Sequence, residues 1–235
     1  MIVNPYKFPF IVLEGIDGCG KSSIVEGLKR KLTPSYPVHF TAEPVAGRGI
    51  EQRIQEILKN NGKDEKTGRM LSNAELQSLF IFDRMNHRCS EEKFLANFAI
   101  ISDRDWESTI AYYMSYGGNP RWVVDEHERI FRAAKKDFFV ADLTLVIDVS
   151  AEVAYNRQQA MRKILDLFEA DLAKIHQRVD AYRSLPKVLS GLVPGIVWSD
   201  HIQFVDGERS PDEVFEDVLG RIHKVAAQKA RASEQ

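Results

Sequence analysis

The stretch Phe10-Ile-Val-Leu-Glu-Gly-Ile-Asp-Gly-Cys-Gly-Lys-Ser-Ser23 contains a glycine, four further residues and then Gly-Lys-Ser. This spacing is the P-loop pattern, which binds the phosphates of nucleoside triphosphates. The apolar residues 8–13 predict a buried parallel strand, and residues 22–32 predict a helix with apolar side chains on one face. A strand before the loop and a helix after it are the context that the motif requires. The stretch therefore predicts a nucleotide site.

The residue types of this loop explain how it would hold a triphosphate. Glycines let the backbone approach the phosphate oxygens closely, and successive N–H groups at the start of a helix stabilise their negative charge. Lys21 adds a cation over the outer phosphates, and the Ser22 hydroxyl can ligate Mg²⁺. A glycine-rich turn that only happens to precede a lysine is the alternative, and the flanking strand and helix argue against it. The predicted ATP contacts are Gly15, Asp17, Gly18, Cys19, Gly20, Lys21, Ser22 and Ser23.

The bulk composition narrows the class of protein. With 235 residues, 44% hydrophobic and 28% charged, the chain suits one globular domain with a full core. A formal net charge of −2 removes any whole-protein argument for nucleic acid binding. The two cysteines, Cys19 and Cys89, form neither a disulfide framework nor a zinc pattern, and we find no apolar stretch of membrane-spanning length and no signal peptide. We therefore expect a cytoplasmic enzyme with no membrane partner.

Strand and helix patterns alternate along the whole chain. Further strands are expected at residues 38–41, 98–102, 143–149 and 202–205. Helices are expected at 50–58, from a capping box at Ser72 and Glu75 to 88, at 108–116, at 126–139, from 151 onward, and at 210–227. Residues 60–69 are predicted to form an exposed loop, and 228–235 a frayed polar tail. The alternation predicts a single α/β domain over residues 1–235, a three-layer α/β/α sandwich around a mainly parallel sheet.

Several candidate site residues have more than one possible interpretation. Asp103 follows a predicted strand, where it could hold the Mg²⁺ shell, orient an acceptor, or simply end the strand in a turn. Phe80 and Arg84 are four residues apart on one helix face, and periodicity alone favours core packing and a surface ion pair. The basic segment 156–163 could be a solvated helix face or a lid over phosphates.

Taken together, six stretches resemble the thymidylate kinases of the P-loop nucleoside monophosphate kinase group, across essentially the whole chain. The matching stretches are residues 13–22, 41–44, 79–84, 103–104 with 108–112, 148–153 and 204–207. The resemblance implies a P-loop NTPase fold and phosphorylation of dTMP to dTDP with ATP and Mg²⁺, in pyrimidine deoxynucleotide synthesis. It also implies a homodimer, for which the sequence contains no independent signal.

The resemblance assigns roles on the acceptor side. Asp17 would reach the 3′-hydroxyl of the acceptor sugar, Phe80 would stack on the pyrimidine, and Arg84 would hydrogen-bond the base edge. Thr109 would lie near the base, and Tyr112 would occupy the space of a ribose 2′-hydroxyl. With the resemblance in hand, Phe80 and Arg84 are interpreted as ligand contacts.

The resemblance also predicts where the catalytic cations lie. Arg104 would clamp the acceptor phosphate. A P-loop with Gly18 in place of arginine goes with arginines in the lid, here about residues 156–170. Arg162 is predicted to stabilise the transition state and Arg157 to stack on adenine. Lys21, Asp103, Arg104 and Arg162 are thus the predicted catalytic set, because phosphoryl transfer depends on positioning and on charge stabilisation.

The chain departs from the family pattern at the acceptor side. Ala42 stands where arginine is usual, and Arg48 and Arg53 are candidates to replace it. Asp105 replaces a usual tyrosine or histidine, and Tyr113 replaces a common glutamine beside the base. Glu43 and Tyr113 remain predicted substrate contacts. These changes leave dUMP or another 5-substituted deoxyuridylate open as the substrate.

A nucleotide-binding switch or regulatory ATPase is the alternative from another class. No stretch resembles the guanine-reading Asn-Lys-x-Asp motif of GTPases. The acceptor-side residues would also have no role in a switch, so the kinase interpretation is preferred.

Overall fold

Five parallel strands form the central sheet of the computed structural model, in the order β3–β6–β2–β8–β9. The structure describes residues 1–32, 37–47, 49–160 and 171–232. The sheet strands are β2 (Phe10–Glu14), β3 (Val38–Ala42), β6 (Ala99–Asp103), β8 (Leu143–Asp148) and β9 (Ile202–Asp206). β2 occupies the centre, so the P-loop that follows it begins in the middle of one sheet edge. The predicted three-layer α/β fold with a parallel sheet is confirmed.

Helices and two small sheets complete the described part of the chain. The helices are α1 (Lys21–Leu32), α2 (Gly49–Lys59), α3 (Asn73–Leu95), α4 (Trp106–Ser115), α5 (Pro120–Ala133), α6 (Ala151–Ala160), α7 (Leu172–Leu192), α8 (Trp198–His201) and α9 (Pro211–Ala232). β1 (Ile2–Val3) pairs in parallel with β7 (Phe139–Val140), and β4 (Lys63–Asp64) pairs antiparallel with β5 (Arg69–Met70).

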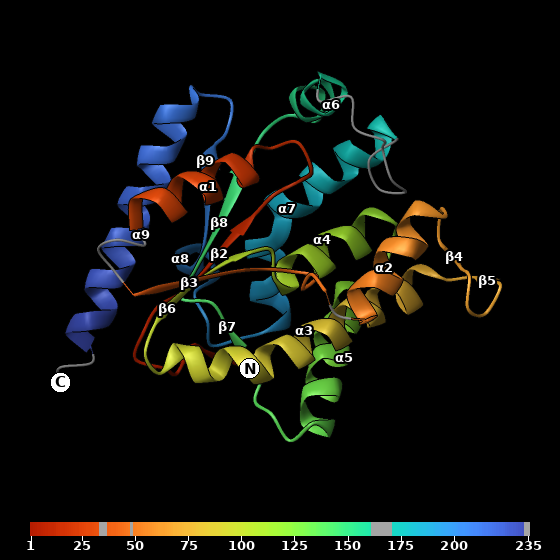
Figure 1. Cartoon of the computed structure of the whole chain (residues 1–235), viewed down its shortest axis with the longest axis horizontal. Helices are drawn as coiled ribbons and strands as arrows, with labels where there is room; N and C mark the ends of the chain where they lie inside the picture. Colours follow the sequence, from red (N-terminus) through yellow and green to blue (C-terminus); the bar gives the residue numbers. More distant parts are fainter. Residues whose placement is uncertain (33–36, 48, 161–170, 233–235) are drawn as a thin grey trace.

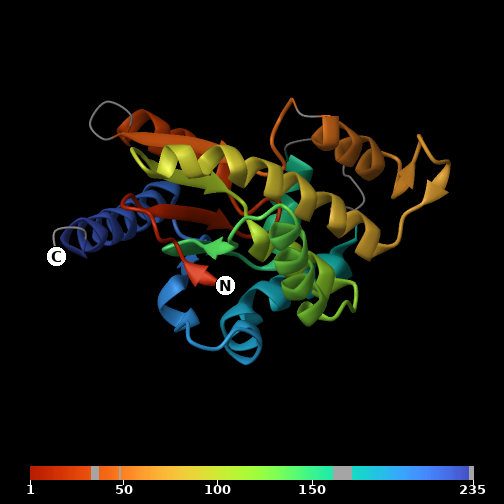
Figure 2. The same ribbon diagram turned by 90° about the horizontal axis from the view of Figure 1, so that it is seen from below.

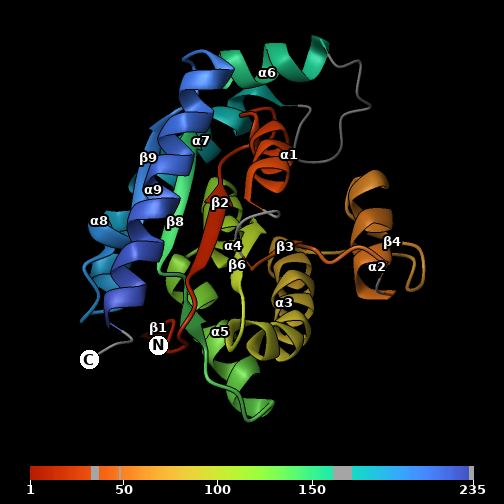
Figure 3. The same cartoon turned by 60° about the vertical axis from the view of Figure 1, so that its left-hand side comes forward.

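The helices cover both faces of the sheet. In Figure 1, α9 lies to the left of the sheet and α1 overlaps the strands, while α4, α5 and α7 lie to the right. Figure 3 shows α6 beyond the same end of the sheet as the start of α1. Successive β2 residues are buried in different core clusters: Ile11 and Leu13 in the larger one, Phe10 and Val12 in a smaller one with Leu95 of α3. Both faces of the central strand are therefore sealed, as expected in a parallel sheet.

The expected strands and the capping box are present. Ser72 Oγ accepts from the Glu75 N–H and Glu75 Oε2 accepts from the Ser72 N–H, at 3.2 and 2.8 Å. This reciprocal pair satisfies two free backbone donors at the start of α3. The local sequence signal for this helix start is therefore confirmed.

Several boundaries differ from the predictions. The loop predicted at 60–69 contains the β4–β5 hairpin, which projects at one end of the molecule (Figure 2). Its turn is organised by the buried Asp64, which accepts hydrogen bonds from Arg53 and Thr67. α3 continues to Leu95 rather than ending at 88. α5 starts at Pro120, where Asn119 caps it, and ends at Ala133, whereas the prediction was 126–139. The tail predicted to fray from 228 continues α9 as far as Ala232.

None of the helices within the described ranges combines enough length with enough apolar character to cross a membrane.

Candidate active site

The predicted site residues meet at the carboxyl edge of three neighbouring strands. Glu43 follows β3, Asp103 ends β6, and the P-loop follows β2. Backbone hydrogen bonds tie these ends together: Glu43 N–H donates to Asp103 O at 3.0 Å, and Arg104 N–H donates to Leu13 O at 2.9 Å. Parallel strands place their carboxyl ends on one edge, where open α/β sheets bind ligands.

The P-loop backbone follows a course that only glycine adopts easily. Gly15, Gly18 and Gly20 have φ angles of 135°, 84° and 104°. A Cβ on Gly15 would lie 2.7 Å from Ile147 O, and one on Gly18 would lie 2.5 Å from Ala154 O. In this conformation a side chain at position 18 would be strained and would clash with α6, which disfavours an arginine there.

Lys21 sits inside this loop and holds its shape. Its Nζ donates to Gly15 O at 2.7 Å and to Ile16 O at 3.2 Å, and the residue is buried. Ser22 and Ser23 are exposed on the first turn of α1, which contains no acidic side chain. No carboxylate in this turn therefore competes with a bound anion for the first-turn N–H groups and the positive end of the helix dipole.

Asp17 links the P-loop to the acceptor-side residues. Its Oδ1 accepts from Arg104 Nη2 at 2.6 Å, and its Oδ2 accepts from the Tyr112 hydroxyl at 2.6 Å. Burial opposes ionisation of Asp17, but the Arg104 guanidinium and the Lys21 ammonium outweigh it, so the pKa of the carboxyl lies well below its usual range. Asp17 is thus a fixed anion between two predicted acceptor contacts.

Arg104 is the most connected cation at this edge. Its Nη1 lies within hydrogen-bonding distance of Gly15 O, Ser108 Oγ and the Tyr182 hydroxyl, at 3.1, 3.0 and 3.2 Å. Its backbone has a φ of 73°, in the left-handed region that L residues rarely adopt. Residues held in such conformations cluster at functional sites.

Three side chains of this cluster were not predicted from the sequence. Glu14 Oε2 accepts from the Tyr182 hydroxyl at 2.8 Å and from Ser108 Oγ at 2.7 Å, and Arg178 lies 5.1 Å from the centre of the Tyr112 ring. Tyr182 and Arg178 belong to α7, a helix that was not predicted. The buried residues Ile175, Val179, Tyr182, Leu185 and Leu189 recur at helical spacing, which would have indicated α7.

Arg84 is buried against protein groups on the acceptor side. Its Nε donates to Glu43 Oε2 at 2.5 Å, and its Nη1 donates to Thr109 Oγ1 at 3.0 Å and to His127 Nε2 at 2.8 Å. Arginine has no acceptor, so His127 Nε2 must accept, and its Nδ1–H donates to Val123 O at 2.8 Å. Burial and the Arg84 charge hold the pKa of His127 well below its ordinary value, which keeps this ring neutral.

Phe80 and Tyr113 are half-buried side chains. Phe80 lies one helical turn before Arg84 on α3, and Tyr113 lies one turn after Thr109 on α4. Both pack against the larger core cluster, and the Tyr113 ring lies 4.7 Å from that of Trp122. The structure brings Glu43, Arg84 and Thr109 into direct contact. Base stacking by Phe80 and base contact by Tyr113 stay predictions.

On the donor side, Arg157 of α6 joins two loops. Its Nη1 donates to Cys19 O of the P-loop at 3.3 Å, and its Nη2 donates to Gly207 O after β9 at 3.1 Å. Its guanidinium therefore lies between the loop predicted to hold phosphates and the turn that starts α9. The expected adenine contact stays a prediction. Arg162 and the lid residues 161–170 lie outside the described residues.

The residues predicted to hold Mg²⁺ fit that ion chemically. Asp103 Oδ1 is buried and has no hydrogen-bond partner among the described residues, and Ser22 offers an exposed hydroxyl. Magnesium prefers hard oxygen ligands and in kinases is held by few protein groups together with substrate phosphates. Within the ranges described, we find no group of three or more His, Cys, Asp or Glu arranged for a metal.

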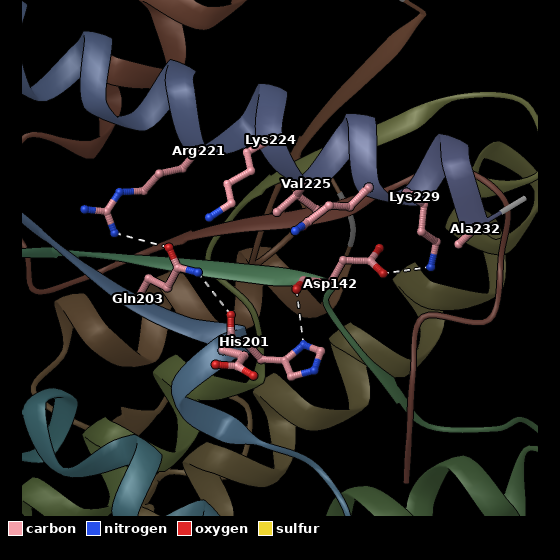
Figure 4. A pocket seen from close by; sticks show the side chains of 10 residues that line it. Asp142, His201, Gln203, Arg221, Lys224, Val225, Lys229 and Ala232 are labelled. Atoms are coloured by element: carbon pink, nitrogen blue, oxygen red, sulfur yellow. Dashed lines mark hydrogen bonds and ion pairs between the residues drawn. The ribbon is translucent and has the colours of Figure 1, made fainter.

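A cavity of about 470 Å³ lies at the opposite end of the sheet, between α9 and the starts of β8 and β9 (Figure 4). Two of its lining cations are paired with carboxylates: Lys229 with Asp142 and Arg221 with Asp217. The cavity contains none of the predicted site residues. The candidate site at the carboxyl edge is therefore separate from this cavity.

Comparison with known proteins gives a consistent picture. A sequence model of the thymidylate kinase family matches residues 13–193. A thymidylate kinase of Carboxydothermus hydrogenoformans is 27% identical over 216 residues, covering 90% of this chain and 95% of that protein. One of Leuconostoc citreum is 31% identical over 215 residues, covering 88% and 91%. A probable thymidylate kinase of Methanococcus maripaludis is 33% identical over 160 residues, covering 68% and 69%. The resemblance drawn from the motifs is confirmed, and this chain belongs to the thymidylate kinase family.

Proposed function

We propose that this protein transfers the γ-phosphoryl group of ATP to the phosphate of dTMP, giving ADP and dTDP. The observation that carries the proposal is the contact of one P-loop carboxylate, Asp17, with both Arg104 and Tyr112. A loop built for a donor triphosphate thereby touches the side chains assigned to the acceptor. A nucleotide switch has no use for this connection.

The chain's own residues supply positioning and charge. The P-loop N–H groups and Lys21 hold the donor phosphates, and Lys21 exchanges its carbonyl contacts for phosphate oxygens when ATP binds. Arg104 holds the acceptor phosphate, because a planar guanidinium matches phosphate oxygens bidentately. Ser22 and Asp103 would hold Mg²⁺, which when bound neutralises charge on the phosphoryl oxygens.

The acceptor base and sugar are recognised on the other side of Asp17. Arg84 can only donate hydrogen bonds, so it favours a base that presents a carbonyl oxygen to it. Tyr112 is buried and its hydroxyl is held by Asp17, so it fills space that a ribose 2′-hydroxyl would need. These two contacts together suit a pyrimidine deoxynucleotide such as dTMP.

A coupled ADP-release assay across dTMP, dUMP, dCMP, dGMP and dAMP tests the proposal. We expect the highest kcat/KM for dTMP. A higher value for dUMP would identify the rival deoxyuridylate substrate, and no turnover with any pyrimidine monophosphate would reject the kinase. Acceptor-independent hydrolysis that is unaffected by Asp17→Ala would instead support a switch or ATPase.

We also propose that the protein is a homodimer and acts in the cytoplasm. Phe82, Phe94 and Phe98, on α3 and just after it, are 46%, 38% and 40% exposed, and they offer apolar surface to a second copy of the chain. Sedimentation equilibrium should give twice the chain mass of 26.8 kDa. A concentration-independent single-chain mass would reject the dimer.

A further inference from the structure

Asp105 follows Arg104 directly and occupies the N-cap position of α4, yet its side chain makes no capping hydrogen bond. Aspartate at this position ordinarily accepts from the backbone N–H groups of the first turn. Here the carboxylate is 1% exposed and turns toward α3. The carboxylate therefore contacts side chains of α3 instead of capping α4.

The carboxylate of Asp105 lies between two arginines of α3. Oδ1 is 3.0 Å from Arg84 Nε, and Oδ2 accepts a hydrogen bond from Arg88 Nη2. The Arg84 Nε–H itself points at Glu43 Oε2, so Asp105 contributes charge and position to Arg84 rather than a second hydrogen bond there. Arg88 is buried over the rings of Phe10 and Phe139, at 4.2 and 4.7 Å, and is the counter-ion of Asp105.

The backbone of Asp105 is anchored as firmly as its side chain. Its N–H donates to Glu14 Oε1 at 2.8 Å, and its carbonyl accepts from Arg84 Nη2 at 2.9 Å. These two bonds hold the peptide that follows the left-handed residue Arg104. Because they use main-chain atoms, they persist when the side chain at 105 is changed.

The contacts leave Arg84 little freedom. Arginine carries five N–H donors. Among the described residues, Nε–H goes to Glu43, both Nη1–H groups go to Thr109 and His127, and one Nη2–H goes to the Asp105 carbonyl. One Nη2–H remains for an acceptor base. The direction of this N–H is fixed by the hydrogen bonds of the other four donors.

We propose that Asp105 is a positioning residue for recognition of the acceptor base, which holds Arg84 through its carboxylate with Arg88 as counter-ion. The inference rests on the proposed role of Arg84 at the base edge. Asp105 touches no substrate itself. Its carboxylate affects binding of the base through Arg84. It does not affect binding of the phosphate, because the hydrogen bonds that support Arg104 use main-chain atoms of Asp105 and not the carboxylate.

Asp105→Asn tests this role with a side chain of the same shape. The amide removes the negative charge 3.0 Å from Arg84 Nε and presents an N–H group to one of the two arginines, which displaces the Arg84 guanidinium against its remaining contacts. We expect the Kd values of thymidine and of dTMP to rise by the same factor, about ten- to hundredfold, with the Kd of ATP unchanged. Isothermal titration calorimetry with thymidine, dTMP and ATP separates these effects. Arg104→Ala is the comparison, because it should weaken dTMP while leaving thymidine binding nearly intact.

The double variant Asp105→Asn with Arg88→Met distinguishes positioning from a merely structural role. Asp105→Asn alone removes the hydrogen-bonded counter-ion of the buried Arg88 and leaves only the longer contact with Glu91 at 3.8 Å, and the methionine removes that poorly compensated charge. We expect the double variant to recover thermal stability while its thymidine affinity stays low. Recovery of both would show a structural role only, and a loss confined to dTMP would place Asp105 on the phosphate side. Either result overturns the proposal, as does unchanged thymidine binding in Asp105→Asn. Wild-type protein that binds neither thymidine nor dTMP would instead reject the proposed function.

Discussion

The proposed donor half of the site consists mainly of main-chain groups, whereas the proposed acceptor half consists mainly of charged side chains. The donor half is mostly main chain: glycines at positive φ, carbonyls held by Lys21, and the open first turn of α1. The acceptor half is a buried array of charged side chains, in which Arg84 and Arg104 are each fixed by a carboxylate. A main-chain site depends on local conformation, whereas a side-chain site depends on partners brought together from distant parts of the chain.

The largest expected effect on activity comes from adding a single methyl group to the P-loop, in the proposed donor half. Gly18→Ala places a Cβ 2.5 Å from Ala154 O at a φ of 84°. The strained backbone alone costs about 1–3 kcal/mol, and the clash moves the loop or α6. We expect kcat/KM for ATP to fall about a hundredfold or more in steady-state assays at saturating dTMP.

Gly195→Ala is the matched control for this substitution. Gly195 has a φ of 91°, but its added Cβ would meet nothing within 4 Å. It should lose some thermal stability and keep its activity. Equal loss of activity in both variants would show that general strain, rather than P-loop geometry, explains the result.

In the acceptor half, Arg84→Ala should separate the two substrates. Loss of the Nη2–H donor should raise the KM for dTMP about ten- to hundredfold and leave the KM for ATP nearly unchanged. Initial rates over a grid of both substrates measure the two constants together. Because Glu43 loses its main counter-ion, folding must be checked by circular dichroism. Arg129→Ala, which removes an exposed partner of Glu126, is the control. Equal effects on both substrates would assign Arg84 to the fold rather than to the base.

A smaller effect, on stability rather than on catalysis, concerns Glu107 beside the acceptor array. Burial and the negative charges of Asp105 and Glu14 raise the pKa of Glu107 from 4.5 to about 8. Between pH 4.5 and 8 the folded protein therefore holds a proton that the unfolded chain releases, so the free energy of unfolding falls as the pH rises. For this group alone, the fall is of order 1.4 kcal/mol per pH unit across that window.

Glu107→Gln removes the titration and should flatten this part of the profile. Chemical denaturation at about pH 5 and about pH 8 should show a smaller difference between the two conditions in the variant than in the wild type. The variant should therefore gain stability relative to the wild type as the pH rises. Identical pH slopes for both proteins would show that Glu107 does not titrate in this range.

Much of the fold was predictable because its signals are local. The P-loop spacing, the capping box at Ser72 and the apolar strand runs depend on near neighbours, and each is present. The β4–β5 hairpin was missed because its polar residues have no apolar periodicity, and Asp64 organises it through side-chain hydrogen bonds. The start of α5 was placed too late, although Asn119-Pro120 is a cap followed by a first-turn proline.

The features of the site also divide into those with local sequence signals and those that depend on tertiary contacts. The sequence by itself determined the nucleotide loop and the parallel α/β order, because glycine conformation and hydrophobic period are properties of short segments. The acceptor residues were predicted through the resemblance to the thymidylate kinases. Only the tertiary structure decided that Asp17 joins Arg104 and Tyr112, that Tyr182 enters from α7, and that Arg84 is held by residues 43, 105 and 127. Those contacts join segments 21 to 168 residues apart, and their energies depend on burial and on distances that exist only once the helices pack against the sheet.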